Sequence, residues 1–322
     1  MTCAKILRQN ILLSVLSLVL FFGAGEIVVR FFAGSPLITE PDNVLFWKYK
    51  KNQTGHQKLY SPVSRVDKFG FRSTGSDFNP AFPSIYCGGD SYTWGEGVLD
   101  SETFSGQLLE ILKSRGLNYN VLNGGVPGYG VEQILNRMKI ECERYNPEYA
   151  ILLWFERDIN RMRNISEQEK ERFLKDYRIR SMFRYSAFSK WLKENIFDKL
   201  LHKELGFGCY TDKNIEYENT HPFSERIEGL TPIIKENTRF LKSKGITPVW
   251  VFMTVPTKEF RDYIVSLANE LSVTLIDPEP AYRYNFPGLE NMATEHSGHF
   301  KPKVYRILAE EAFSKLNIIP KQ

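Results

Sequence analysis

The sequence predicts an α/β protein whose parallel sheet carries helices on both faces. From about residue 83 onward, short apolar stretches alternate with stretches of helical periodicity, and repeated β–α units are typical of parallel sheets. Residues 149–155 form an unbroken apolar run, as expected for a strand that is buried on both faces. The apolar stretch that ends in a Gly-Gly pair, residues 83–89, is expected to contain the first strand.

The other elements are expected in a simple order along the chain. Further strands are expected at residues 119–123, 247–253 and 273–277, and helices at about residues 103–115, 131–144 and 223–244, before residue 273 and after Pro302. The preceding residues 33–82 are rich in Pro, Gly, Asn and aromatic residues. We expect short strands in that segment, with residues 65–72 as a hairpin on the edge of the domain.

The amino terminus carries an apolar stretch that could cross a membrane. Residues 11–25 are uncharged, basic residues precede them, and the apolar character continues past Glu26 and Arg30 to Phe32. About 20 apolar residues span a bilayer, and the i, i+4 spacing lets Glu26 and Arg30 pair near the far interface. We expect an uncleaved single-pass anchor in the inner membrane with a cytosolic amino terminus and a periplasmic or extracellular domain. The alternative is a cleaved signal peptide with a small-residue site at residues 23–25, which would give a secreted protein.

These patterns divide the chain into an anchor, residues 1–34, and an α/β domain, residues 35–322. Within the domain, residues 161–215 differ in kind, because Arg and Lys alternate there with aromatic residues. This composition predicts a helical insertion with a basic face. Such an insertion could cover the site, lie against anionic headgroups or be a solvated amphipathic helix.

Composition and charge exclude few classes of protein. The net charge of +4 is mild and gives no reason to expect nucleic acid as a partner. The four cysteines, Cys3, Cys87, Cys142 and Cys209, match no metal-ligand spacing. We expect no metal or organic cofactor, and free thiols at Cys3 and Cys87. A disulfide between Cys142 and Cys209 stays open, and so does the oligomeric state.

Ser91 is the candidate nucleophile. It follows Gly89 and Asp90 directly after the first expected strand, and ligands of open α/β sheets bind at the carboxyl ends of the strands. A serine there can be exposed to substrate, and nearby backbone N–H groups can stabilise its oxyanion. The simpler interpretation is a glycine-rich turn that Ser91 merely caps.

A serine nucleophile needs a base, and histidine is the usual one. His296 and His299 lie in the loop between the last expected strand and the last expected helix. That loop belongs to the same edge of the sheet as Ser91. A pair of histidines beside Glu295 at this position favours a catalytic role over that of ordinary surface residues.

Three blocks of sequence resemble the SGNH (GDSL) hydrolase superfamily. They are Gly-Asp-Ser at residues 89–91, Asn-Gly-Gly-Val-Pro-Gly at residues 123–128, and His-Phe at residues 299–300 before the terminal helix. The apolar amino terminus and the Gly-Phe-Arg element at residues 70–72 resemble its membrane-anchored bacterial members. The resemblance implies a flavodoxin-like three-layer α/β/α sandwich that acts on esters.

The same resemblance implies roles for single residues. Ser91 would be the nucleophile with its own N–H in the oxyanion hole, Gly128 would donate a second N–H, and His299 would be the general base. The family's third block ends in Gly-x-Asn-Asp, and this chain has Arg157 where that Asn belongs. A guanidinium can also donate to an oxyanion, and Asn160 is an alternative donor.

The last block departs from the family as well. The family has an Asp three residues before its His, and here that position is His296. Glu295 could orient His299 instead, or the two residues Ser91 and His299 could act as a dyad without an acid.

Three functions follow from these residues. The first is hydrolysis of a small acyl ester, such as an acetyl ester, on an envelope or exported glycan or lipid through an acyl-Ser91 intermediate. The second is O-acyl transfer with the same residues, in which a sugar hydroxyl replaces water. The third is a degenerate domain that binds a glycan or a partner without turnover, and the two altered blocks favour it.

Overall fold

The computed structural model describes residues 3–58, 61–161, 165–197, 221–293, 298–316 and 318. Its centre is a five-stranded sheet in the order β6-β5-β7-β8-β9, with every neighbouring pair parallel. The strands are β5 (Ser84–Gly88), β6 (Asn120–Asn123), β7 (Tyr149–Trp154), β8 (Thr247–Phe252) and β9 (Thr274–Ile276). This order is the flavodoxin-like one, and it places the first strand of the sheet beside the second and the third.

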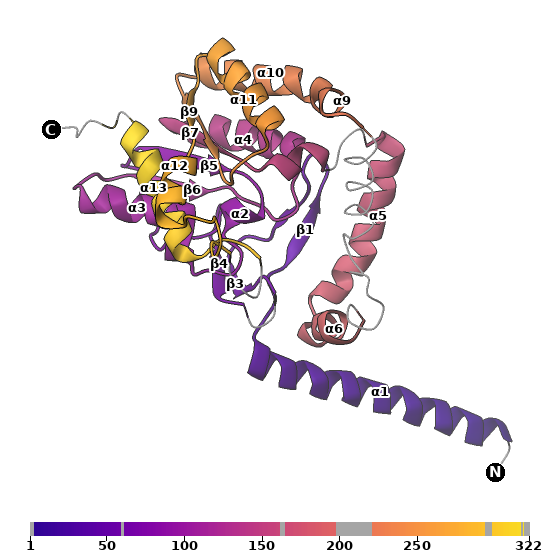
Figure 1. Cartoon of the computed structure of the whole chain (residues 1–322). Coiled ribbons are helices and arrows are strands. Elements are labelled where there is room, and N and C mark those ends of the chain that lie inside the picture. Colours follow the sequence, from indigo (N-terminus) through magenta and orange to yellow (C-terminus); the bar gives the residue numbers. More distant parts are fainter. Residues whose placement is uncertain are drawn as a thin grey trace.

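Helices cover both faces of the sheet, so the expected three-layer sandwich is confirmed (Figure 1). One face packs on α3 (Phe104–Ser114), α12 (Glu279–Asn285) and α13 (Pro302–Lys315). The other face packs on α4 (Val131–Tyr145), α10 (Leu230–Ser243) and α11 (Lys258–Glu270). Successive residues of a strand point to opposite faces: Ile151 enters the first core and Leu152 the second. The apolar run predicted at 149–155 is therefore buried from both sides.

The predicted helix at residues 223–244 is two helices. The first is α9 (Phe223–Glu228) and the second is α10, and Gly229 separates them. The domain also contains short helical turns: α2 (Ser91–Trp94), η1 (Asp100–Glu102) and η2 (Glu156–Asn160). The carboxyl ends of β5 and β7 lead directly into α2 and toward η2.

The segment before the sheet contains short strands, as expected, and they form two small antiparallel pairs. These are β1 (Thr39–Asp42) with β2 (Phe46–Tyr49), and β3 (Gln53–His56) with β4 (Val63–Val66). The hairpin expected at residues 65–72 is present: Val66 bridges Arg72, the N–H of Asp67 donates to Phe71 O at 2.9 Å, and the N–H of Ser73 donates to Arg65 O at 2.8 Å. Arg72 also bridges Asn123 at the end of β6, so this segment joins the edge of the main sheet.

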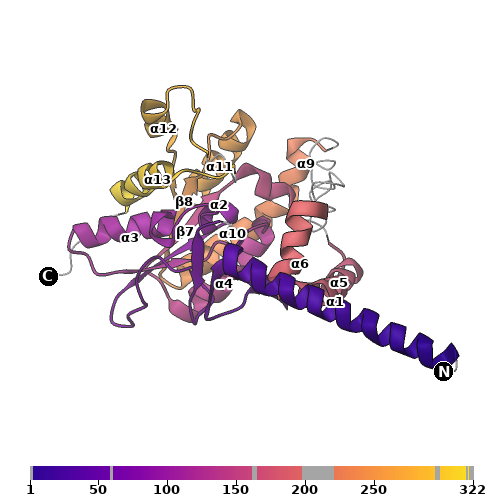
Figure 2. The same ribbon diagram turned by 90° about the horizontal axis from the view of Figure 1, so that it is seen from below.

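An apolar helix, α1 (Cys3–Ala33), extends from the domain, as Figure 2 shows in a second view. It is long and apolar enough to cross a membrane. In its most apolar stretch of 18 residues, none is buried by the rest of the protein. The predicted pair of Glu26 and Arg30 forms, with 2.6 Å between Oε1 and Nε.

The predicted insertion contains helices α5 (Glu167–Arg184) and α6 (Ala187–Leu192) and the π-helical turn η3 (Lys193–Phe197). α5 packs beside β1 and β2 through Phe173 and Tyr177, and α6 lies against α1 (Figure 1). The remaining part of the insertion, including Cys209, lies outside the described residues. Cys142 is buried, carries a free thiol, and has a raised pKa because of that burial.

Candidate active site

Ser91 is the first residue of α2, immediately after the carboxyl end of β5. Asp90 caps this short helix, since its Oδ1 accepts the backbone N–H of Tyr92 at 2.9 Å. Ser91 is 8% exposed, and its Oγ lies 3.3 Å from Asp90 Oδ2. The strand and the cap together hold the hydroxyl at the edge of the sheet where ligands bind in such folds.

His299 reaches the same point from the loop before α13. Its Nε2 lies 2.8 Å from Ser91 Oγ, although 208 positions separate the two residues. This is hydrogen-bond distance, the geometry that a serine nucleophile and its base require. Of the residues predicted for the site, Ser91 and His299 are thus brought together.

Tyr92 holds the histidine loop in place. Its ring lies between Phe155 and His299, with centroid distances of 4.6 Å to each. Its hydroxyl donates to Gly298 O at 3.4 Å, and its pKa is raised, first because the side chain is buried. Tyr305 of α13 donates to Tyr92 O at 2.9 Å. The residue after the serine therefore fixes the position of the base.

The glycine-dense loop after β6 packs against the backbone of α2. A Cβ on Gly125 would lie 2.2 Å from the backbone nitrogen of Trp94, and a Cβ on Gly89 would lie 1.9 Å from Thr93 Oγ1. Asn123 Nδ2 donates to Thr93 O at 3.0 Å. A side chain at either position would collide with α2, so the packing of α2 explains the second glycine of each of the two pairs, Gly89 and Gly125.

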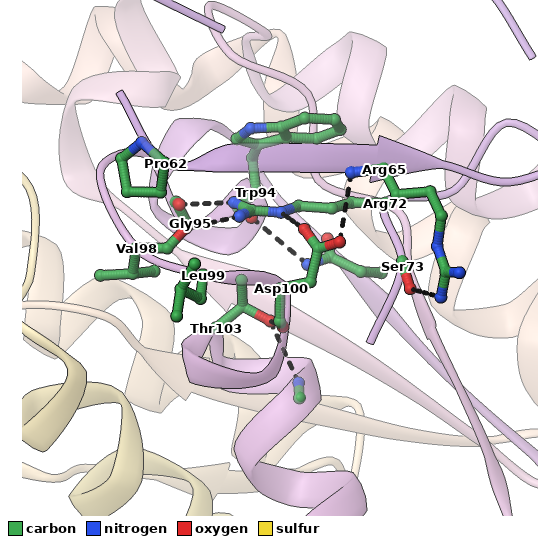
Figure 3. A network of polar contacts seen from close by, with 12 residues as sticks. Pro62, Arg65, Arg72, Ser73, Trp94, Gly95, Val98, Leu99, Asp100 and Thr103 are labelled. Atoms are coloured by element: carbon green, nitrogen blue, oxygen red, sulfur yellow. Dashed lines mark hydrogen bonds and ion pairs between the residues drawn. The ribbon is translucent and has the colours of Figure 1, made fainter. Parts of the chain in front are cut away.

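Arg72 binds the other end of α2 (Figure 3). The residue is 1% exposed, and its guanidinium donates to the carbonyl oxygens of Trp94, Gly95 and Val98. Its Nε also pairs with Asp100 Oδ1 at 2.8 Å. One buried cation thus satisfies the orphan carbonyls at the end of α2 and holds the loop that follows.

A second cation, which is partly buried, lies behind Ser91. Arg161 Nη1 is 2.9 Å from Asp90 Oδ2 and 2.7 Å from Asp158 Oδ1. The pKa of Asp158 is raised well above its usual range, first by burial and then by the neighbouring Asp90 carboxylate. Burial acts to lower the pKa of Arg161, but the charges of Asp158 and Asp90 outweigh it and raise that pKa. Arg161 therefore stays charged, and Asp158 keeps its proton to a higher pH than an ordinary aspartate does.

A further carboxylate faces His299. Glu96 is 5% exposed, and its Oε2 lies 3.9 Å from His299 Nε2. Gln57 Nε2 donates to the same oxygen at 2.8 Å, and Lys58 Nζ lies 2.6 Å from Oε1. Glu96 is five positions after Ser91 in the sequence. This place, at the same edge of the sheet, is the signal that could have identified Glu96 as a residue of the site.

The remaining predicted residues have separate outcomes. Gly128 has a left-handed φ of +83° and lies beside Trp47, in the loop after β6. Arg157 is exposed on η2, whereas the partly buried Arg161, one turn later, is the arginine that pairs with Asp90. Asn160 is buried, and Arg226 Nη1 donates to its Oδ1 at 3.3 Å. Glu295 and His296 lie outside the described residues, so the acid for His299 stays a prediction.

No group of His, Cys, Asp or Glu suited to a metal ion occurs among the described residues. Beside the pair of Ser91 and His299, the described site contains two ion-pair networks, those of Arg72 and Arg161.

Comparisons with known proteins give structural matches only. No family model matches the chain, and no curated protein matches it. Solved structures that resemble it include a lipase/acylhydrolase from Enterococcus faecalis, at 16% identity and a TM-score of 0.45, over 75% of this chain and all of the other. An acetyl xylan esterase, AlAXEase, resembles it at 16% identity and a TM-score of 0.43, over 72% of this chain and 99% of the other.

A member of the lipolytic protein G-D-S-L family from Veillonella parvula gives 12% identity and a TM-score of 0.43, over 73% of this chain and 99% of the other. All three likenesses are below 25% identity, so the resemblance to SGNH (GDSL) hydrolases continues to rest on the sequence blocks at residues 89–91, 123–128 and 299–300.

Proposed function

We propose that this chain is a serine ester hydrolase that works through an acyl-Ser91 intermediate. The observation that carries the proposal is the 2.8 Å contact between Ser91 Oγ and His299 Nε2 at the carboxyl edge of the sheet. Ester hydrolysis needs a nucleophile, a base within hydrogen-bond reach, and donors for the developing oxyanion.

The reaction would proceed in two halves. Ser91 Oγ attacks the ester carbonyl while His299 Nε2 takes the hydroxyl proton, and the departing alcohol oxygen receives that proton from His299. Water then attacks the acyl-serine with His299 again as the base, which releases the acid and restores the serine. The N–H groups of Ser91 and Gly128 are the oxyanion donors that we propose, since both belong to loops at this edge of the sheet.

The two cations also support this chemistry. Arg161 neutralises Asp90, whose Oδ2 lies 3.3 Å from Ser91 Oγ. An unpaired carboxylate there would compete with His299 for the serine proton and would repel the oxyanion. We therefore assign Arg161 the role of neutralising Asp90, which differs from the donation to the oxyanion that the sequence suggested for Arg157.

For the substrate we propose an acyl ester on an envelope or exported glycan or lipid. This proposal rests on α1, which would hold the domain at the outer face of the inner membrane with the amino terminus in the cytosol. The packing of Gly25 and Glu26 against α6 favours a retained anchor over a cleaved signal peptide.

Labelling with a fluorophosphonate probe tests the nucleophile. Full-length protein in detergent should be labelled, and Ser91→Ala and His299→Ala should both abolish labelling and the hydrolysis of p-nitrophenyl acetate. Ser114→Ala, an exposed serine at the end of α3, is the matched control and should behave as the wild type.

The same experiment separates the alternatives. Labelling with slow hydrolysis that a sugar acceptor accelerates would indicate O-acyl transfer. Absence of labelling in folded wild-type protein would contradict the proposal and support a binding domain without turnover.

A further inference from the structure

The last turns of α1 have one face against protein and one face without it. Val29 and Ala33 are buried, at 7% and 3% exposed, in a small cluster with residues of α6. On the other face, Phe31 is 81% exposed and Phe32 is 72% exposed. Apolar side chains exposed to this degree on adjacent positions indicate a surface that is covered by something other than water.

α6 packs along the apolar part of α1. The ring of Phe188 lies 5.6 Å from that of Phe21 and 5.7 Å from that of Phe22. One turn later, a Cβ on Gly25 would lie 2.8 Å from the Phe188 ring. Trp191 stacks on the other side of Phe188 with an interplanar angle of 10°. The aromatic side chains of α6 therefore pack against the part of α1 whose sequence is typical of a membrane span.

The charges of α1 are satisfied by the same contact. Glu26 accepts the backbone N–H groups of Ala187 and Phe188, at 3.0 and 2.9 Å, and the hydroxyl of Ser186 at 2.8 Å. Arg30 pairs with Glu26 and donates to Tyr185 O at 2.7 Å. A charged residue inside an apolar span is costly unless it is paired. Glu26 thus caps α6, and α6 in turn satisfies Glu26.

The length of α1 sets the depth of this contact. The run from residue 11 to residue 32 is about 33 Å long at about 1.5 Å per residue, close to the bilayer hydrocarbon thickness of about 30 Å. If lipid covers Phe31 and Phe32, then Phe21 and Phe22 lie deeper still. An element that contacts α1 along its turns between Phe21 and Phe32 must therefore lie at the depth of the lipids.

We propose that α6 contacts the lipids of the leaflet nearest to the α/β domain. Tyr185, just before α6, and Trp191, in its last turn, are of the residue types that favour the membrane interface. The inference rests on the proposed membrane anchorage of α1 and goes beyond it, because it assigns lipid contact to a segment more than 150 positions away. α5 and α6 then fix how the domain stands on the bilayer.

Quenching of tryptophan fluorescence by brominated lipids tests this contact in the full chain. Of the five tryptophans, Trp47, Trp94, Trp154 and Trp250 are each at most 4% exposed in the domain. Trp191 is therefore the one within reach of lipid. In phosphatidylcholine vesicles with brominated acyl chains, wild-type protein should lose emission relative to unbrominated vesicles, and Trp191→Phe should abolish that loss.

Two glycines of α1 provide a matched pair of variants. A Cβ on Gly23 meets no atom within 4 Å, whereas a Cβ on Gly25 meets Phe188. Gly23→Leu should keep the quenching of Trp191, and Gly25→Leu should lose it because α6 is displaced. Both variants add the same apolar side chain to α1, so a difference between them reports docking and not insertion.

Two further measurements, flotation with the vesicles and the intact mass of the protein, distinguish failure of the lipid contact from failure of the membrane anchor. A chain that floats at full mass but shows no Trp191 quenching would overturn the lipid contact and leave the anchor intact. A chain that is shortened near residue 25 and does not float would overturn both. Equal quenching in Gly23→Leu and Gly25→Leu would also contradict the docking on which the proposal depends.

Discussion

Asp90, the residue before the candidate nucleophile, is joined to Arg161 by an ion pair of 2.9 Å. The same guanidinium nitrogen holds Asp158 at 2.7 Å, and both carboxylates are 1% exposed. Two carboxyl groups thus share one cation behind Ser91. This arrangement makes the stability of the site depend on one side chain that the sequence did not single out.

Replacing this cation should be severely destabilising. Arg161→Met leaves two buried carboxyl groups without a counter-charge, and breaking such a pair costs about 3–5 kcal/mol. The free energy of unfolding, measured with urea, should fall by that amount. Arg306→Met removes an exposed ion pair with Glu310, which should cost less than about 1 kcal/mol. Similar losses in the two variants would contradict the importance assigned to the shared cation.

The raised pKa of Asp158 predicts a pH dependence of stability. The folded protein binds this proton more tightly than the unfolded chain, so the stabilisation is complete below the ordinary Asp pKa and is lost as the pH rises through the folded pKa. The loss is about 1.4 kcal/mol for each pH unit between the two pKa values. Asp158→Asn cannot lose a proton. Its unfolding free energy relative to wild type should therefore rise as the pH increases above the ordinary Asp pKa. Parallel pH profiles would contradict the prediction.

Arg72 should position Ser91 as well as stabilise the fold. Arg72→Lys cannot serve three carbonyl groups and Asp100 with one ammonium, and each buried group left unsatisfied costs about 1–3 kcal/mol. We expect slower fluorophosphonate labelling of Ser91 at temperatures where the variant is still fully folded. Arg65→Lys, an exposed arginine of the same network (Figure 3), should label at the wild-type rate. A folded Arg72→Lys with unchanged labelling would leave Arg72 a purely structural role.

The glycine loop predicts a further steric effect. Gly125→Ala would place a Cβ 2.2 Å from the Trp94 backbone nitrogen, so α2 must move. A displacement of about 1 Å in an active site can cost on the order of 100-fold in rate, and we expect labelling of Ser91 to slow by that order. Gly288→Ala, whose Cβ would meet nothing closer than 3.4 Å, should have no effect. Equal rates in the two variants would show that α2 tolerates the shift.

Local sequence patterns are sufficient to predict much of this protein. The alternation of strands and helices, the run at residues 149–155 and the apolar span of α1 each depend on side chains that are neighbours in the chain. The i, i+4 pair of Glu26 and Arg30 is of the same kind, since helix geometry alone brings the two residues together. Ser91 and His299 could be proposed because strand order places their loops at one edge of the sheet.

Only the tertiary structure decided which partners the charged side chains bind. Arg157 and Arg161 are four positions apart on the same segment, but only Arg161 faces Asp90, and no local period separates the two. Arg72 finds its carbonyl partners 22 to 26 positions away, and Glu26 caps a helix about 160 positions away. Ion pairs and hydrogen bonds of this kind depend on how separate elements pack. The sequence therefore determined the order of the elements and the candidate nucleophile and base, and the packing of those elements decided which cations lie behind them.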